Sequence, residues 1–498
     1  MSAGPPHLLA IDAGTTGVTA LVFDRDLRRV RGGYREFAQR FPAPGYVEHE
    51  AAAILGALDA ALAEALAGFD GAIAAVGVTN QRETVFAFHR GRREPLGPGL
   101  VWQDRRTAAR CSELRGAGHS ALVQARTGLV LDPYFSATKV EWLLRERPEV
   151  AAAARAGELA FGTVDTLVLQ HLTRGAAGWL TDVTNAARTL LYDIDRRAWS
   201  PELAALFGVA LDTLPEVRPS IGDFGEAHLP GGRRAPILGV AGDQQAALFG
   251  QGCWKAGTAK STYGTGNFLV LNTGAERRDS RSGLLTTLAV GRRGEPVYAL
   301  EGSVFSCGVA IQWLRDQLGF FDVSAASEAL ARSVPDTAGV TFVPAFTGLG
   351  APYWDPDARA ALLGLTRGTT RAHIVRAALD AIAFQCAEVV ELLRADSGLP
   401  LDTLLVDGGA AANDLLMQRQ ADLAGLTVRR PADIEATARG AAALAGVGAG
   451  PAAGFWSDPA EAAAFQVGVR TFAPALAAPE RAAELAAWRR AVQRVRSS

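Results

Sequence analysis

The residues most able to do chemistry stand in glycine-rich turns directly after apolar segments. The first turn is Asp12-Ala13-Gly14-Thr15-Thr16-Gly17. Glycine permits positive φ, so consecutive backbone N–H groups in such a turn can point at an anion, and the threonine hydroxyls add donors. The carboxylate of Asp12 can hold Mg²⁺, mostly through water. The alternative interpretation is a plain hairpin turn without a ligand. For one such sequence considered alone, that interpretation is the more common one.

A second turn of this kind, Gly264-Thr265-Gly266, lies in the other half of the chain. The two turns join apolar segments 7–12 to 18–24 and 259–263 to 268–272, which predicts two β-hairpins with the same plan. Such duplication indicates two similar α/β halves facing each other across a cleft. We therefore predict that the two hairpins hold the phosphate chain of one nucleotide.

A third glycine turn, Asp407-Gly408-Gly409-Ala410, joins a predicted strand at 403–407 to a predicted helix from about Asn413 to Ala424. Glycines at this junction let a ligand approach the backbone, and a helix N-terminus favours phosphate. A tight strand-to-helix connection explains the same residues without any ligand. This turn therefore supports a phosphate site only in combination with the other two.

Asp243 is the candidate for proton transfer. It stands in Ala241-Gly242-Asp243-Gln244-Gln245, where a predicted strand ends and a predicted helix begins. A carboxylate in that position commonly caps the helix. In a kinase it instead orients the substrate hydroxyl and accepts its proton late in phosphoryl transfer.

Arg82 and Glu83 place opposite charges side by side at the end of the predicted strand 72–79. One interpretation is a surface ion pair, which contributes at most about 1 kcal/mol. In a closed site the same pair offers fixed donors and acceptors to neighbouring hydroxyls. Trp102 would add a flat apolar wall for a carbon backbone.

Strands and helices must alternate to position these turns, and the sequence shows that alternation. Residues 50–69 form a predicted amphipathic helix with Ile54, Leu58, Leu62 and Leu66 at a spacing of four. A chain of 498 residues exceeds one ordinary core. We predict two domains, residues 1–250 and 251–498, with the first phosphate hairpin in the former.

The composition describes an ordinary globular protein, 49% hydrophobic and 20% charged, with a net charge of −2. Such a charge argues against a dedicated nucleic-acid or membrane-surface binder. The N-terminal residues lack the pattern of a secretory signal, no long uncharged apolar stretch predicts a membrane span, and the four scattered cysteines suit a reducing compartment. A P-loop is rejected because Lys260-Ser261 follows alanine and lacks the glycine spacing.

Together these residues resemble the FGGY family of carbohydrate kinases over nearly the whole chain, from about His7 to Arg494. Long segments are similar to the family's own, and 344–368 is the most specific of them. The segments are PGYVEHE (44–50), TNQRET (79–84), VWQDRRT (101–107), TGLVLDPYFSATK (127–139), FGTVDT (161–166), AGDQQAALFGQ (241–251), YGTGNF (263–268) and PAFTGLGAPYWDPDARAALLGLTRG (344–368).

The resemblance implies an α/β fold of two duplicated actin-like ATPase (ribonuclease H-like) domains with the active site in the cleft between them. It implies a cytoplasmic enzyme that uses ATP and Mg²⁺ to phosphorylate glycerol to sn-glycerol 3-phosphate, without nucleic acid, as a homodimer or homotetramer. Asp243 is implied as the general base and, with Asp12, as a magnesium-associated carboxylate. The implied polyol ligands and walls are Arg82, Glu83, Trp102, Tyr134, Asp243, Gln244 and Phe268, and the implied nucleotide contacts are Thr15, Thr16, Thr265, Gly308, Gln312, Gly409 and Asn413.

The chain departs from the family at Thr19, where the usual residue is an arginine that reaches the nucleotide phosphates. This departure predicts weaker ATP binding or another cation in compensation. Residues 229–235 are also shorter than the loop through which some members bind fructose 1,6-bisphosphate. Two other functions remain open: a kinase of the same family for another polyol or ketose, and a catalytically silent sensor of this fold. The pairing of Arg82, Glu83 and Trp102 favours glycerol, and the retained Asp12 and Asp243 favour catalysis.

Overall fold

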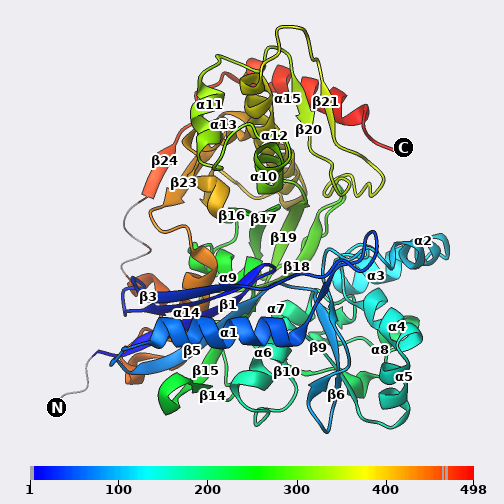
Figure 1. Ribbon diagram of the computed structural model, residues 1–498, viewed down its shortest axis with the longest axis vertical. Helices are drawn as coiled ribbons and strands as arrows, with labels where there is room; N and C mark the ends of the chain where they lie inside the picture. The colour runs from blue at the N-terminus through cyan, green and yellow to red at the C-terminus, as the bar shows by residue number, and fades with distance from the viewer. Residues whose placement is uncertain (1–4, 463–464, 466–468, 498) are drawn as a thin grey trace. The chain divides into compact units, whose positions relative to one another are not determined.

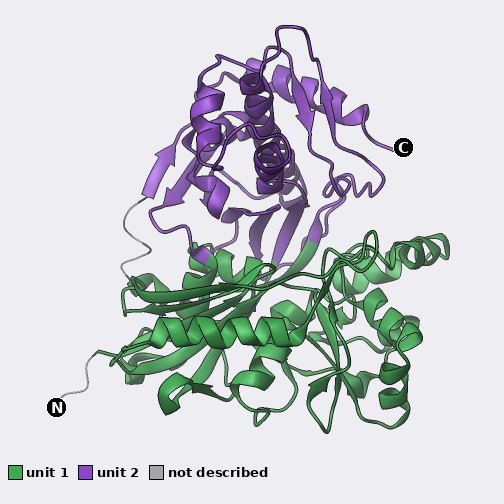
Figure 2. Ribbon diagram, viewed as in Figure 1, with its two compact units in different colours: residues 1–254, 286–298, 437–466 green, residues 255–285, 299–436, 467–498 purple. Residues whose placement is uncertain are grey.

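The computed structural model describes residues 5–462, 465 and 469–497. The chain forms two compact units, each assembled from separate segments, as Figure 2 shows. Unit 1 contains residues 1–254, 286–298 and 437–466, and unit 2 contains 255–285, 299–436 and 467–498. The assignment of two sequence domains that meet near residue 250 stays a prediction. Among the described residues, no helix is both long and apolar enough to span a membrane.

Unit 1 is built on a six-stranded sheet in the order β14-β15-β5-β1-β2-β3. Strands β1, β5 and β15 run parallel, whereas β1–β2, β2–β3 and β14–β15 pair antiparallel. The three parallel strands therefore end at the same edge of the sheet. Their bounds are β1 (His7–Ala13), β2 (Gly17–Phe23), β3 (Arg29–Glu36), β5 (Ile73–Asn80), β14 (Glu226–Leu229) and β15 (Arg233–Gly242).

Alternating side chains of this sheet fill two separate cores. Leu9, Ile11 and Val78 pack on one face with α1 (Ala51–Leu66) and α6 (Val164–Leu172). Leu8 and Ala10 pack on the other face with α9 (Asp243–Gly250) and α14 (Ala436–Ala449). Figure 1 shows α1 lying along the sheet. Because successive side chains of a strand point to opposite faces, an apolar strand such as β1 serves both cores.

Gly77 explains how α14 reaches the sheet. A Cβ at residue 77 would lie 2.0 Å from the carbonyl oxygen of Ala441. Only glycine allows the backbones of β5 and α14 to approach so closely. This helix of the second half of the sequence is thereby packed into unit 1.

The rest of unit 1 surrounds a second, five-stranded sheet that includes β6 (Val85–His89) and β9 (Leu159–Thr163). Its remaining strands are β4 (Glu48–His49), β7 (Glu94–Pro95) and β8 (Gly99–Leu100). Smaller pairs are β10 (Leu180–Asp182) with β13 (Glu216–Arg218) and β11 (Tyr192–Asp193) with β12 (Ala198–Trp199). The accompanying helices are α2 (Ala108–Gly116), α3 (Ser120–Thr127), α4 (Ala137–Glu146), α5 (Pro148–Arg155), α7 (Val183–Ala186) and α8 (Pro201–Leu206).

Unit 2 repeats the plan of unit 1. Its strands belong to a seven-stranded sheet in the order β18-β19-β17-β16-β22-β23-β24, with β18 at Leu285–Val290. In this sheet β16, β22 and β23 run parallel, and β16–β17 and β23–β24 pair antiparallel. The hairpin β16–β17 thus corresponds to β1–β2, and β22 corresponds to β5. The strands are β16 (Ala259–Tyr263), β17 (Asn267–Gly274), β19 (Pro296–Val304), β22 (Thr403–Asp407), β23 (Thr427–Pro431) and β24 (Val469–Phe472).

The long helix α12 (Arg371–Ser397) packs against this sheet and α13 (Asp414–Ala424) within one apolar core. Val389, Val390 and Leu393 of α12 are fully buried there. Further elements of the chain are α10 (Gly308–Asp316), α11 (Ala326–Arg332), α15 (Ala478–Gln493), β18 (Leu285–Val290), β20 (Thr341–Val343) and β21 (Ala361–Leu363).

Candidate active site

The parallel strands of unit 1 carry the predicted catalytic residues at their carboxyl ends. Asp12 of β1 and Ala241 of β15 both stand opposite Thr79 of the intervening β5. Asp243 follows two residues after Ala241, at the first position of α9, and Arg82 and Glu83 follow β5. The topology therefore brings Asp12, Arg82, Glu83 and Asp243 to one edge of the sheet.

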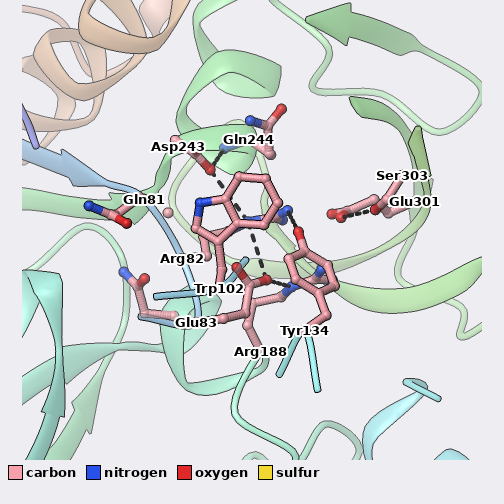
Figure 3. A network of polar contacts seen from close by, with 12 residues as sticks. Gln81, Arg82, Glu83, Trp102, Tyr134, Arg188, Asp243, Gln244, Glu301 and Ser303 are labelled. Atoms are coloured by element: carbon pink, nitrogen blue, oxygen red, sulfur yellow. Dashed lines mark hydrogen bonds and ion pairs between the residues drawn. The ribbon is translucent and has the colours of Figure 1, made fainter. Parts of the chain in front are cut away.

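Arg82 is the centre of this cluster, as Figure 3 shows. Its Nε lies 3.7 Å from Glu83 Oε1 and 3.4 Å from Asp243 Oδ1. Its terminal nitrogens donate to Gln245 Oε1 and to the Tyr134 hydroxyl, each at 3.2 Å. Only 2% of the Arg82 and Glu83 side chains is exposed, so the interpretation as a surface ion pair is wrong.

Glu83 is fixed by its own backbone and by a second arginine. Its φ of 62° lies in the left-handed region, which a non-glycine residue adopts only when its surroundings enforce it. Ser136 donates to its carbonyl oxygen at 2.8 Å, and the fully buried Arg188 donates to its carboxylate at 2.6 Å. Glu83 therefore presents an oriented carboxylate to the site.

Tyr134 and Trp102 form an aromatic corner beside the charged cluster. Their rings meet edge to face, with centroids 5.6 Å apart, and Tyr134 is almost fully buried. The buried ammonium of Lys139 donates to the Tyr134 carbonyl at 3.2 Å, and burial lowers its pKa to about 8. The Trp102 indole donates to the Thr15 hydroxyl at 3.0 Å, which connects this corner to the first glycine turn.

Asp243 stands inside α9 rather than capping it, because Gly242 is the N-cap residue. Its Oδ1 accepts from the backbone N–H of Gln244 at 2.7 Å, and 29% of its side chain is exposed. The neighbouring Gln244 is 5% exposed. Asp243 is thus the more accessible partner of its ion pair with the buried Arg82.

The two glycine turns have the same length and the same place between paired strands, but their closing hydrogen bonds differ by one residue in span. Each contains three residues, 14–16 between β1 and β2 and 264–266 between β16 and β17. Gly14 N–H donates to Gly17 O at 3.0 Å, and Gly264 N–H donates to Gly266 O at 2.9 Å. Thr16 and Thr265 are exposed at the tips of these turns. The predicted duplication of the hairpin is therefore present in the backbone.

Unit 2 contains a cavity of about 470 Å³ next to its glycine turn. It is bounded by that turn, by the first residues of α10 and by the connection from β22 to α13. Ile311, Leu379 and Leu416 give it an apolar wall. Of the predicted nucleotide contacts, five line this cavity, namely Thr265, Gly308, Gln312, Gly409 and Asn413.

Helix N-termini at this cavity favour an anion. The helix α13 begins there with Asn413 as its cap, whose side chain accepts from Leu416 N–H at 3.0 Å, and α10 begins at Gly308. Each contributes the positive end of a helix dipole. An apolar wall beside such termini suits the base and phosphates of a nucleotide. The remaining predicted contacts, Thr15 and Thr16, belong to unit 1, and Phe268, a predicted polyol wall, is a half-buried residue of β17 in unit 2.

A magnesium ion fits the carboxylates of unit 1 only with part of its water shell. Asp12 and Ala241 are separated by two strand spacings, or about 10 Å between backbones. Among the described residues, no group of three or more histidine, cysteine or acidic side chains forms a ready metal site. Magnesium characteristically keeps waters and binds through one or two carboxylates together with substrate phosphates. Asp12 and Asp243 suit that mode of binding.

Sequence reasoning missed Arg188, Gln245 and Ser136, which hold Arg82 and Glu83 in place. Arg188 follows the polar run Thr181-Asp182-Val183-Thr184-Asn185, all of it buried. Polar residues between apolar segments could have indicated a buried polar network here, because buried polar side chains need hydrogen-bond partners.

The two halves of the chain match the two family models of one enzyme class. Residues 7–250 match the N-terminal domain of the FGGY family of carbohydrate kinases, and residues 259–449 match its C-terminal domain. The chain belongs to the FGGY family of carbohydrate kinases. Two duplicated α/β domains of the actin-like ATPase kind are the fold of this class.

Within that class, the chain is similar to glycerol kinases. It is 52% identical to the glycerol kinase of Aromatoleum aromaticum, over 98% of this chain and 99% of that one. It is also 52% identical to the glycerol kinase of Bordetella parapertussis, over 98% and 96% of the two chains. The crystal structure of Plasmodium falciparum glycerol kinase with ADP superposes with a TM-score of 0.89 at 34% identity, covering 99% of this chain and 98% of the other.

Proposed function

We propose that this protein transfers the γ-phosphoryl group of MgATP to glycerol, giving sn-glycerol 3-phosphate and ADP. The full-length likeness to glycerol kinases at about half identity carries this proposal. The buried cluster of Arg82, Glu83 and Tyr134 beside Asp243 gives it a chemical basis. Charged and polar groups of that kind can satisfy the hydroxyls of a small polyol, and an analogue lacking one would leave a buried group unpaired.

In this reaction Asp243 accepts the proton of the attacking hydroxyl. Its carboxylate is partly exposed, and the Arg82 guanidinium 3.4 Å away restrains it. Arg82 and Glu83 bind the hydroxyls of glycerol, Gln244 adds a polar contact, and Trp102, Tyr134 and Phe268 exclude water along the carbon chain. Positioning of the nucleophile is the main task of such a base, because phosphoryl transfer passes through a loose transition state.

We propose that the cavity of unit 2 binds ATP through Thr265, Gly308, Gln312, Gly409 and Asn413. Thr15 and Thr16 of the first hairpin are further phosphate contacts. Magnesium neutralises phosphate charge when bound, and Asp12 with Asp243 would hold it. Residues 1–250 then supply the polyol site and the first hairpin, and residues 251–498 supply the nucleotide site.

A location in the cytoplasm and a homodimeric or homotetrameric assembly complete the proposal. The four buried cysteines, none of them in a disulfide, suit a reducing compartment.

The first test is an ADP-release assay with MgATP and a panel of glycerol, dihydroxyacetone, erythritol, xylulose, ribulose and gluconate. We expect strong preference for glycerol. Preference for another polyol would support kinase activity but contradict glycerol as the substrate. Absence of turnover with every compound would favour a catalytically silent sensor.

The role of Asp243 is tested by Asp243→Asn. Loss of the base and of the charge facing Arg82 should lower kcat by at least about 100-fold, since general base catalysis contributes that much. Glycerol and ADP should still bind, as measured by calorimetry. An Asp243→Asn enzyme with ordinary turnover would place the base elsewhere.

A further inference from the structure

A buried carboxylate lies behind the active-site edge of unit 1 without reaching it. Asp182 ends β10, caps α7 and is 0% exposed. Its Oδ1 accepts from the backbone N–H and the side-chain amide of Asn185, at 2.9 and 2.8 Å. Its Oδ2 accepts from the backbone N–H and the hydroxyl of Thr184, at 2.9 and 2.7 Å, and from the Ser220 hydroxyl at 2.7 Å.

One branch of this network leads to the end of β5. The side-chain amides of Asn185 and Asn80 pair reciprocally, at 2.9 and 3.1 Å. Asn80 is the last residue of β5, and its amide also donates to the carbonyl oxygen of Gln81 at 2.8 Å. The next two residues are Arg82 and Glu83. The carboxylate of Asp182 therefore anchors, through Asn185, the point where the backbone leaves the sheet to present that pair.

The other branch leads to the end of β15. The Thr184 hydroxyl donates to Asp182 and accepts from the backbone N–H of Gly242 at 2.9 Å. Gly242 is the last residue of β15, and Asp243 follows it directly. The same carboxylate thus anchors the residue that precedes the base.

We propose that Asp182 is a positioning residue that holds Asp243 in register with Arg82 and Glu83. The inference rests on the proposed function, because it assumes that these three residues act on the substrate. Inside the sheet, the ends of β5 and β15 are related by the ladder between these strands, which has a register irregularity between Ile237 and Gly239. Outside the sheet, Arg82 contacts Asp243 and Gln245 through its side chain, which does not fix the backbone of either strand end. The Asp182 carboxylate, buried and fully hydrogen-bonded, fixes the end of β5 through Asn185 and the end of β15 through Thr184.

The substitution Asp182→Asn tests the whole network. A carboxamide has the same shape, but its NH₂ group replaces one acceptor, so at least two of the five donors lose their partner whichever way it is turned. We expect kcat to fall by about 100-fold, the cost of displacing a reacting group by about 1 Å. The dissociation constant for ADP measured without magnesium should stay unchanged, because the cavity proposed to bind the nucleotide is lined by residues of unit 2 and Asp243 is proposed to meet the nucleotide only through the metal.

A pair of substitutions at Thr184 tests the branch to Asp243. Thr184→Val removes the acceptor of the Gly242 N–H and should lower kcat roughly tenfold. Thr184→Ser keeps the hydroxyl and should restore most of that loss. Thr166→Val is the matched control, because Thr166 is also buried and its hydroxyl donates to Leu180 O at 2.8 Å, away from both strand ends.

All values of kcat are expressed per folded molecule, so that a loss of stability alone does not lower them. A merely structural role predicts that Thr184→Val and Thr166→Val lower the melting temperature alike and leave kcat within about twofold of the parent, and this result would overturn the proposal. Lack of glycerol phosphorylation by the parent protein would instead overturn the proposed function. The two failures are therefore distinguishable.

Discussion

Glu83 is held between two arginines that serve it differently. Arg188 bonds its carboxylate at 2.6 Å from a fully buried position, whereas Arg82 lies 3.7 Å away and divides its donors among several partners. The Arg188 guanidinium also lies over the ring of Phe135, 5.2 Å from its centroid. Arg188 therefore sets the orientation of Glu83. Arg82 is then available to contact the proposed substrate and the proposed base, Asp243.

Replacing Arg188 should weaken glycerol binding selectively. In Arg188→Met, the Glu83 carboxylate loses its shortest charged bond inside the protein, and removing one partner of a buried pair typically costs several kcal/mol. We expect the KM for glycerol to rise at least about tenfold, with the KM for MgATP unchanged, in steady-state assays. Arg188→Lys retains the charge but lacks the planar guanidinium group. Its KM for glycerol should lie between those of the parent and of Arg188→Met. Equal rises in both KM values would show that the whole fold had been disturbed.

At the scale of elements, the sequence predicted what local patterns determine. The hairpins 7–24 and 259–272, the helix after residue 50 and the strand 403–407 are confirmed, because apolar segments, glycine turns and an apolar spacing of four act over a few residues. The packing of α14 in unit 1 could not be predicted. It depends on the contact between Gly77 and Ala441, which are far apart in sequence.

The turn 264–266 and helix α10 fit together only because residue 308 is glycine. Gly308 N–H donates to Gly264 O at 2.9 Å, and a Cβ at residue 308 would lie 2.6 Å from that oxygen. In Gly308→Ala the turn must move away from α10. We expect a rise of roughly tenfold in the KM for MgATP and in the ADP dissociation constant, equivalent to about 1.4 kcal/mol.

The glycerol KM should rise less than the KM for MgATP in Gly308→Ala, because Arg82, Glu83 and Asp243 belong to unit 1 and Phe268 alone of the proposed polyol contacts follows this turn. A second control is Gly368→Ala, also in unit 2 but outside the cavity lining, where a Cβ would lie 3.8 Å from the Thr366 hydroxyl, an ordinary contact. A Gly308→Ala enzyme with unchanged ADP affinity would contradict the role assigned to this contact.

At the scale of the whole molecule, two buried groups in unit 1 oppose each other when the pH changes. Burial lowers the pKa of the His49 imidazole to about 4, from an ordinary value of 6.5. Burial, together with the charge of Asp182, raises the pKa of Asp165 to about 6 from 3.8. Neither pKa was predictable from the sequence, because both come from burial by segments distant in the chain.

The signs follow from proton binding in the folded and unfolded states. Below pH 6.5 the unfolded chain protonates His49 and the folded protein does not, so stability is lost as the pH falls from 6.5 to 4. Between pH 3.8 and 6 the folded protein keeps a proton on Asp165 that the unfolded chain releases, so stability is gained as the pH falls through this window. Each contribution amounts to roughly 3 kcal/mol over its full range.

Separate removal of the two groups should therefore reveal effects that partly cancel in the parent protein. Relative to the parent, His49→Gln should become more stable by about 2–3 kcal/mol as the pH falls from 6.5 to 4.5, and Asp165→Asn should become less stable by about 2 kcal/mol. The measurement is the free energy of unfolding in urea at each pH, taken as a difference from the parent so that all other titrating groups cancel. If both variants follow the parent with a constant offset, His49 and Asp165 titrate alike in the folded and unfolded chains, and burial does not control their charge.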